Sequence, residues 1–447
     1  QFGLKLLWKD RGYSATAILT LAICIGANTA IFTIVNSILL KPLPVPASDR
    51  ILLMSNQYKN AGGGNSMFSG APDYYDRLRD LNVFEEQAMY NPSNWAFDID
   101  GAPELIRGMN ATPSLFRLLR VAPAQGRIFE ESEGEIGNHQ RIILSYGLGR
   151  QLYGEKPAPI GQPIRLAGIP YTLVGVMPRG FEFADPSARF WVPLAFSTQQ
   201  KSDNARHNNN WVNVGRLKSG ATIEQTQQQI NALNAANLDR FPENRQILIN
   251  GGFHTTVERL QDALVRSIRG TLYLLWGGAA FVLLIGGVNI ANLALARSNL
   301  RGKELTTRLA LGAPRAQLVR QLIVESLLIT LASGAAGTAV GFGILKTLAT
   351  IGLERLPRAG EIHMDLNVFG AALLVSIAVG LLIGLVPAAH LFKTDLALLL
   401  HEESRTGTIG RKARAIRRTL VVAQVAIAFI LLIGSGLLLA SFRNLLA

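Results

Sequence analysis

Five long stretches without a charged residue constrain this chain more than any other feature. Each has about 18 residues or more, enough for a helix to cross the roughly 30 Å core of a bilayer. With 49% hydrophobic and 17% charged residues over 447 positions, the chain is too apolar to consist only of soluble domains. The sequence therefore predicts a helical membrane protein whose spans cover residues 14–40, 271–296, 321–345, 366–390 and 419–442.

The positive charge indicates which segments face the cytoplasm. The formal net charge is +13, yet residues 41–269 carry 24 Lys and Arg against 22 Asp and Glu, so the excess lies beside the apolar runs. Basic residues next to spans are retained on the cytoplasmic side, and nucleic-acid binding would instead gather them on one folded domain. We therefore expect no nucleic-acid partner, an outer side with 41–270 and 346–365, and cytoplasmic segments at 1–13, 297–320 and 391–418.

Residues 41–270 have the sequence pattern of a soluble α/β domain inserted between the first two spans. Strand-like runs at 141–144, 171–176 and 190–192 alternate with helical stretches at 73–80 and 222–238. Gly168 separates two short apolar runs and predicts a hairpin. The expected fold class is thus membrane α-helical, with about five spans and one inserted extracytoplasmic α/β domain.

The chain carries no recognisable catalytic motif. The pair Gly302-Lys303 lacks the upstream glycine of a phosphate-binding loop, and His401-Glu402 lacks the second histidine of a zinc helix. The single cysteine, Cys24, lies within an apolar run and has no disulfide partner in the chain. We expect no catalytic residue, no cofactor or metal in this chain, and no enzymatic activity of its own.

Polar residues inside the predicted spans are candidate functional positions, because unsatisfied polar groups are costly in lipid. They could line a polar translocation path, or they could hydrogen-bond one helix to another. Neighbouring small residues, as in the Gly26-Ala-Asn-Thr-Ala30 segment, favour close helix packing. The candidates are Asn28, Asn289, Asn292, Glu325 and Gln424.

The loop between the second and third spans carries the most informative pattern. Leu305 and Leu309 lie one helical turn apart, Gly312 follows as a predicted C-cap, and Pro314 restarts the chain toward the third span. A short amphipathic helix of this kind lies along the inner membrane face. It either anchors the next span at the lipid interface or docks a cytoplasmic partner.

Two sets of residues resemble known families. Glu304, Arg308, the Ala310-Leu-Gly-Ala313 run and Glu325-Ser326 resemble the signature of the FtsX-like permease domain. Residues 19–32, 40–44, 126–129 and 143–146 resemble the MacB-like periplasmic core domain behind a first span. Residues 417–426 and 436–442 resemble the opening of the second half in the duplicated permeases typical of acidobacteria. The repeated layout, together with Gln rather than Met at position 1, predicts that the chain is part of a longer one.

The resemblance implies a permease of an ABC transporter-like system in the bacterial inner membrane. A cytoplasmic ABC ATPase on a separate chain would bind and hydrolyse ATP, and a second permease half, a homodimer or a periplasmic adaptor would complete the assembly within the membrane lipids. The coupling residues that it implies are Glu304, Arg308, Gly312, Ala313 and Arg315. The implied role is efflux, or envelope or lipoprotein transport; the alternative is a signalling or scaffold protein that regulates an envelope enzyme.

Overall fold

The computed structural model describes residues 10–62, 66–99, 102–301, 304, 307–309, 311–351, 362–393 and scattered positions between 422 and 436. It divides into two compact units. The sheet unit runs from Ile38 to Arg269. The helical unit comprises the described parts of Gln1–Ser37, Gly270–Leu353 and Ile362–Ala447.

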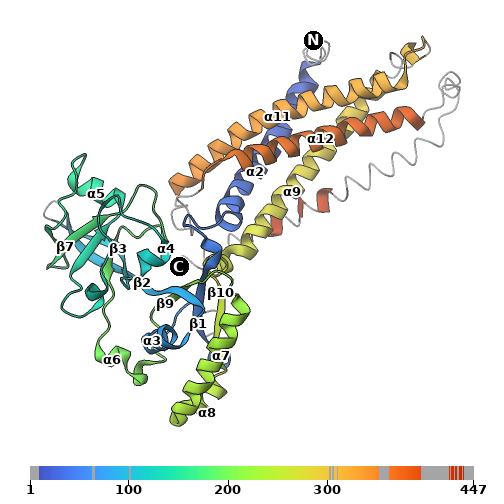
Figure 1. Cartoon of the computed structure of the whole chain (residues 1–447). Coiled ribbons are helices and arrows are strands. Elements are labelled where there is room, and N and C mark those ends of the chain that lie inside the picture. The colour runs from blue at the N-terminus through green and yellow to red at the C-terminus, as the bar shows by residue number, and fades with distance from the viewer. Residues whose placement is uncertain are drawn as a thin grey trace. The chain divides into compact units, whose positions relative to one another are not determined.

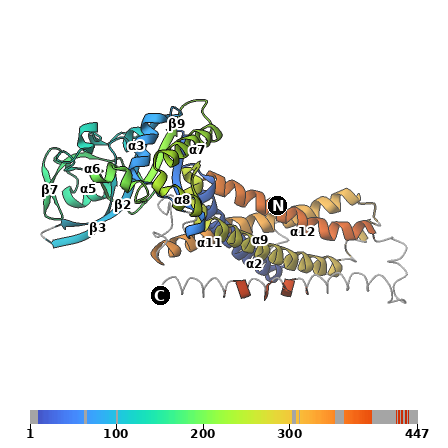
Figure 2. The ribbon, with the colours of Figure 1, turned by 90° about the horizontal axis from the view of Figure 1, so that it is seen from below.

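The helical unit is built from long apolar helices that lie side by side in both views of the ribbon (Figures 1 and 2). In the described part of the chain, four helices are long and apolar enough to cross a membrane. They are α2 (Arg11–Val35), α9 (Leu260–Leu300), α11 (Arg315–Ile351) and α12 (Leu366–Lys393). The fifth predicted span, 419–442, lies mostly outside the described residues.

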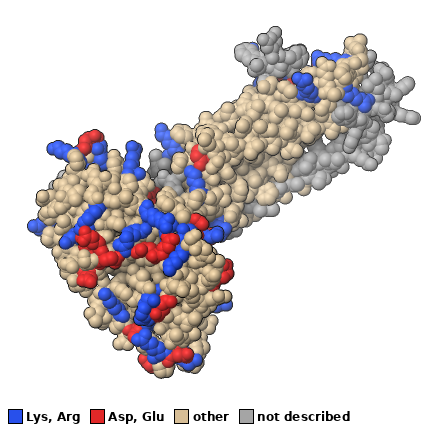
Figure 3. Space-filling model, in the orientation of Figure 1, with Lys and Arg blue, Asp and Glu red and all other residues tan. Residues whose placement is uncertain are grey.

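The helices extend beyond the apolar runs that predict them. Helix α9 begins at Leu260 rather than at 271, because Asp262 and the arginines that follow it end the apolar run but not the helix. Helix α2 ends at Val35 and continues as a π-helix, Asn36–Leu40. On the face drawn in Figure 3, side chains along the helices are uncharged and Lys and Arg gather at one end of the helices.

Glycines let the helices approach backbone to backbone. A Cβ atom on Gly26 of α2 would lie 2.8 Å from the carbonyl oxygen of Gly337 in α11, and one on Gly337 would lie 2.9 Å from that of Ala22. Gly286 of α9 instead makes room for a side chain, since a Cβ atom there would lie 2.6 Å from the sulfur of Cys24 in α2. Such contacts permit the close van der Waals packing on which helix association in lipid depends.

Replacing Gly337 by leucine should separate α2 from α11 and lower the free energy of unfolding by about 1–3 kcal/mol, the usual cost of overpacking. The measurement is thermal unfolding of the purified protein in detergent. Gly343→Leu is the matched control, since a Cβ at Gly343 of the same helix meets no atom within 4 Å. Equal unfolding temperatures for the two variants would show that the glycine contact contributes nothing.

The sheet unit contains one mixed sheet with strand order β10-β1-β9-β2-β3-β8-β5-β7-β4, with β6 pairing β7 and touching β2. Strands β3 and β8 are parallel, as are β5 and β7, and the other pairs are antiparallel. The strands are β1 (Ile51–Tyr58), β2 (Phe84–Ile99), β3 (Ala102–Ala111), β4 (Gln125–Gly126), β5 (Arg141–Leu144), β6 (Pro163–Leu166), β7 (Ile169–Val176), β8 (Phe190–Pro193), β9 (Val212–Leu217) and β10 (Phe253–Arg259).

Helices cover this sheet, and the largest apolar cluster lies beneath α4, around Phe116, Phe129 and Trp191. The helices are α3 (Ala71–Asp80), α4 (Leu115–Leu119), α5 (Tyr146–Tyr153), α6 (Thr198–Lys201), α7 (Ile223–Arg240) and α8 (Pro242–Asn250). The predicted hairpin is confirmed as β6 and β7, which turn through Ala167 and Gly168, both at positive φ.

Candidate functional site: a polar ring between α9 and α11

The loop from α9 to α11 ends its short helical segment at Gly312, as the sequence predicts. Gly312 has a φ of +88°, which favours glycine. The N–H of Gly312 donates to the carbonyl of Leu309 at 3.1 Å, and the N–H of Ala313 donates to that of Arg308 at 3.0 Å. This pair of bonds is the Schellman arrangement. Helix α11 then begins at Arg315, directly after Pro314.

Five polar side chains close a ring beside this turn. Arg301 Nη1 donates to Glu325 Oε2 at 3.3 Å, and Arg301 Nε lies 3.5 Å from Glu304 Oε2. Arg308 Nη2 donates to Glu304 Oε1 at 2.6 Å, and its Nη1 donates to Gln321 Oε1 at 3.4 Å. Gln321 Nε2 closes the ring on Glu325 Oε1 at 3.0 Å. The polar ring therefore joins the end of α9, the loop and the first turns of α11.

Glu325 is the most deeply buried member of the polar ring, with 9% of its side chain exposed. Next to it, Arg297 of α9 donates through Nε to Asp10 Oδ2 at 3.0 Å and lies over the ring of Tyr13 at 4.7 Å. A small cavity of about 30 Å³ is shared by Tyr13, Arg297 and Glu325 with Pro387 of α12. Side chains from four helices thus meet at this end of the helical unit.

The opposite side of the loop is exposed. Leu311 is 82% exposed, and Gly312 and Arg315 are also exposed, whereas Ala313 is half-buried. The side chains of Leu305 and Ala310 lie outside the described residues. The exposed turn is compatible with both roles expected from the sequence, an anchor at the lipid interface and a docking element for a cytoplasmic partner. Among the described residues, no group of three or more His, Cys, Asp or Glu side chains could hold a metal ion.

The predicted intramembrane residues differ in whether they form hydrogen bonds. Asn28 Nδ2 donates to the carbonyl of Ala279 in α9 at 2.6 Å and to that of Cys24 at 2.9 Å, so it joins α2 to α9. Glu325 belongs to the polar ring. Within the part of the chain that the structure describes, Asn289, Asn292 and the Nε2 atom of Gln424 have no hydrogen-bond partner, and Asn289 is exposed. The structure therefore supports helix-to-helix bonding for Asn28 alone among the four amides.

Gln261, in the first turn of α9, is a linking residue that the sequence pattern does not reveal. Its Nε2 donates to the carbonyl of Lys41 at 2.8 Å and to that of Leu39 at 3.2 Å. Gln261 therefore ties the chain that enters the sheet unit to the chain that leaves it. A lone glutamine outside an apolar run gives no signal, and the same holds for Gln321 in the polar ring.

The pair Arg301 and Glu325 should be energetically coupled. A double-mutant cycle with Arg301→Gln and Glu325→Gln should give a coupling free energy of about 1–2 kcal/mol in unfolding experiments, because the two groups bond directly within one network. The control cycle pairs Glu325→Gln with Arg320→Gln, which the described structure does not connect, and should give no coupling. Additive effects in both cycles would contradict the ring as a stabilising element.

Comparison with known families agrees with this architecture. A sequence model of the MacB-like periplasmic core domain matches residues 14–233, and one of the FtsX-like permease C-terminal domain matches residues 276–396. The first match covers α2 and most of the sheet unit. The second covers the apolar part of α9, the polar ring, α11 and α12.

Curated relatives carry ATP-binding/permease names. The macrolide export ATP-binding/permease protein MacB of Bdellovibrio bacteriovorus is 26% identical over 66% of this chain and 43% of its own length. The pyoverdine export ATP-binding/permease protein PvdT of Pseudomonas syringae pv. syringae is 23% identical over 62% of this chain and 40% of its own length. The chain thus matches about two fifths of each relative.

Solved structures with partial likeness are periplasmic or permease domains. The periplasmic region of MacB from Actinobacillus actinomycetemcomitans has a TM-score of 0.35 and 10% identity, over 49% of this chain and 93% of that one. A domain of a putative permease from Porphyromonas gingivalis has a TM-score of 0.38 and 14% identity, over 48% and 90%. At these TM-scores the family assignment rests on the sequence matches.

Proposed function

Since the chain is a permease of the MacB/FtsX type, with an extracytoplasmic α/β domain inserted behind its first span, we propose that it is the membrane subunit of an ABC transporter-like system. In this proposal a separate cytoplasmic ABC ATPase supplies ATP hydrolysis, and no catalytic residue or cofactor is assigned to the described part of this chain. The system resides in the bacterial inner membrane and serves efflux of small compounds, or envelope or lipoprotein transport. The relatives named for macrolide and pyoverdine export favour efflux.

The observation that carries this proposal is the polar ring beneath an exposed turn. A partner that binds Leu311 and Arg315 would displace a loop whose charged side chains bond to one another and to Glu325 of α11. The ring also includes Arg301 at the end of α9. A displacement of the loop would therefore act on α9 and α11 at the same time. The ATPase-coupling roles of Glu304, Arg308, Gly312, Ala313 and Arg315 belong to this proposal.

Helix α9 provides the route from the loop to the sheet unit. It continues unbroken from Leu300 to Leu260, and Leu260 and Ala263 lie in the main apolar cluster of the sheet unit. A displacement of α9 would also move the backbone at Leu39 and Lys41, because Gln261 of α9 is hydrogen-bonded to both carbonyls. In this proposal, ATP hydrolysis in the cytoplasm changes the sheet unit mechanically.

Leu311→Asp should abolish stimulation of the ATPase without unfolding the chain, because the leucine is exposed and a charge there disrupts an apolar docking contact. The experiment reconstitutes the full chain in nanodiscs with the ABC ATPase subunits encoded beside it and follows ATP hydrolysis. Leu105→Asp is the control, since Leu105 of β3 is 71% exposed in the sheet unit. Failure of the wild type to bind any of these subunits would favour the signalling or scaffold alternative.

Gln261→Ala should leave ATP hydrolysis intact while it uncouples the sheet unit. In the reconstituted complex, ATP should change hydrogen exchange in β1 and β10 of the wild type, and the variant should lose most of that change. Two lost hydrogen bonds worth about 1 kcal/mol each are enough for this effect. Gln246→Ala, on the exposed side of α8, serves as the control. An unchanged response in Gln261→Ala would exclude this link from the route.

A further inference from the structure

One side of α9 is largely open. Five residues that follow one another at alternating intervals of three and four form a stripe along this side, the spacing of a helix–helix contact. They are Val282, Ile285, Asn289, Asn292 and Ala296, called the α9 stripe below. The first, third and fifth are exposed and the other two are half-buried. In the described structure, none of the five belongs to the apolar cluster that Ile290 of α9 shares with Leu21 and Ile25 of α2.

Two carboxamides make the α9 stripe unsuited to face lipid. Asn289 and Asn292 lie three residues apart, on adjacent turns of one face of the helix. Neither has a hydrogen-bond partner among the described residues. A polar group without a partner is costly in hydrocarbon, and lipid tails offer no donor or acceptor. The stripe therefore requires a polar partner at the depth of these two residues.

The predicted span 419–442 carries a matching group. Gln424 is the only residue of this span with an amide side chain. Gln424 and Ala428, one helical turn apart, are half-buried, whereas Val425 and Phe429 are exposed. The Nε2 atom of Gln424 is buried and has no hydrogen-bond partner among the described residues. The packed side of this segment is thus the side that bears an unpartnered amide.

The amides of the two segments lie at matching depths. Asn292 precedes Arg297 by five residues, and Gln424 follows Arg418 by six. At about 1.5 Å per helical residue, each lies about 8–9 Å from the arginine that marks the cytoplasmic end of its apolar run. A contact between these two segments would therefore bring the amides together without displacing either segment across the membrane.

We propose that residues 419–442 pack antiparallel along the α9 stripe, with Gln424 hydrogen-bonded to Asn289 and Asn292. A glutamine carboxamide offers two N–H donors and one acceptor oxygen, enough to bond both asparagines at once. In this arrangement Ala428 lies next to Ile285, so a small side chain faces a large one. Small residues at such a contact allow the close packing that joins helices in lipid.

The geometry of the chain allows this contact. Pro387 of α12 lines the same small cavity as Arg297 of α9, so α12 ends close to the cytoplasmic end of the stripe. The predicted cytoplasmic linker, residues 391–418, joins α12 to the segment and is long enough to reach it. Because one chain supplies both surfaces, their effective concentration is high.

A second copy of the chain is the competing occupant of the stripe. Its α9 would place Asn289 and Asn292 against their own counterparts and would leave Gln424 Nε2 without a partner in lipid. Contact with residues 419–442 satisfies the amides of both segments together. The two occupants therefore predict different cross-links.

Disulfide formation in the full chain tests the contact. In a Cys24→Ala background, which removes the native cysteine, Asn292→Cys and Gln424→Cys are introduced together. Oxidation in nanodiscs should give a product that migrates as a monomer without reductant. Trypsin should then release residues 270–297 joined to residues 419–443, because both peptides follow an arginine, end in one and contain none between.

Ala291→Cys combined with Gln424→Cys is the depth-matched control. Ala291 packs against the apolar cluster shared with α2, so its side chain points away from the stripe, and it should give about tenfold less of the linked peptide or none. A cross-linked dimer of Asn292→Cys alone would place a second copy on the stripe. That dimer, or the absence of any link between the two peptides, would overturn the proposal.

A second measurement does not depend on cysteine chemistry. Asn292→Leu and Gln424→Met should each lower the unfolding temperature in detergent, and the double variant should lose less than the sum of the two shifts, because each substitution removes a group that the other leaves unpaired. Asn28→Leu with Gln424→Met is the control, and its shifts should add, since Asn28 bonds to the carbonyl of Ala279. Additive shifts for Asn292 and Gln424 would contradict the contact.

Discussion

The backbone contact of α2 with α11 at Gly26 and Gly337 is the interaction on which the helical unit depends. Apolar helices gain no hydrophobic attraction from one another in lipid, so their association rests on close packing and on interhelical hydrogen bonds. The glycines supply the first, and Asn28, bonded to the carbonyl of Ala279, supplies the second. With α2 held in this way, Asp10 and Tyr13 at its first turns reach Arg297 of α9.

The polar ring builds on that packing. Glu325 and Arg301 are the members of the ring that are largely withdrawn from water, with 9% and 18% of their side chains exposed, and a buried ion pair is costly unless its charges are fully bonded. Every member of the ring contacts two others. Glu325 therefore remains an acceptor for both Arg301 and Gln321 at the end of an apolar helix. Because removal of one member leaves a partner unsatisfied, the ring behaves as a unit. A unit of this kind can transmit a displacement from the loop to the helices.

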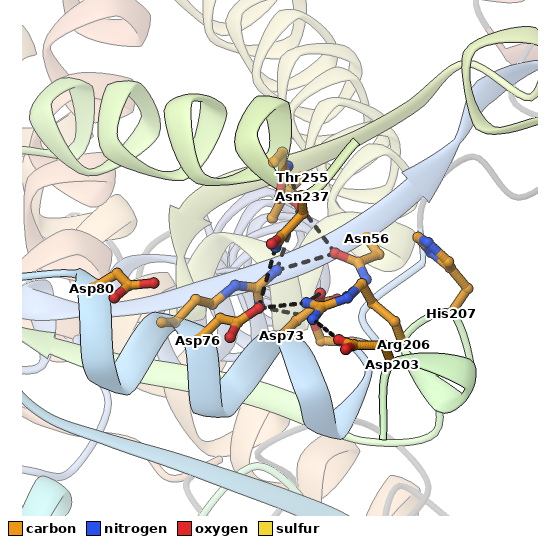
Figure 4. A network of polar contacts seen from close by, with 12 residues as sticks. Asn56, Asp73, Asp76, Asp80, Asp203, Arg206, His207, Asn237 and Thr255 are labelled. Carbon is orange, nitrogen blue, oxygen red and sulfur yellow. Dashed lines mark hydrogen bonds and ion pairs between the residues drawn. The ribbon is translucent and has the colours of Figure 1, made fainter. Parts of the chain in front are cut away.

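A second polar network holds the elements of the sheet unit together (Figure 4). Like the polar ring it consists of arginine, carboxylate and amide side chains, but its members lie much farther apart in the sequence. Arg77 of α3 bonds to Asn213 of β9 and Asn56 of β1, and Arg206 joins α3 to the loop before β9. These bonds hold the helices against the sheet where Asn56 accepts from Thr255 of β10. Because β10 leads directly into α9, a displacement of α9 would act on a sheet edge whose strands are bonded to one another and to α3.

The sequence by itself determined the features that depend on neighbouring residues. The apolar spans follow from the absence of charge over a bilayer's thickness, the turn at Gly312 from the φ that only glycine adopts easily, and the β6–β7 hairpin from Gly168 between two apolar runs. The glycine-rich segments likewise predicted close helix packing, because a missing side chain has a local consequence for how near a second backbone can come.

Only the tertiary structure decided which distant groups meet. Apolar runs could not locate the start of α9, since a helix tolerates the charges at Asp262 and Arg266 that end such a run. Nothing adjacent in the sequence marks Gln261 as a partner of Lys41, or Gln321 as a partner of Arg308. The network around Arg206 is equally invisible in the sequence, because its members come from segments far apart along the chain. Hydrogen bonds of this kind depend on distances that the folded chain alone sets.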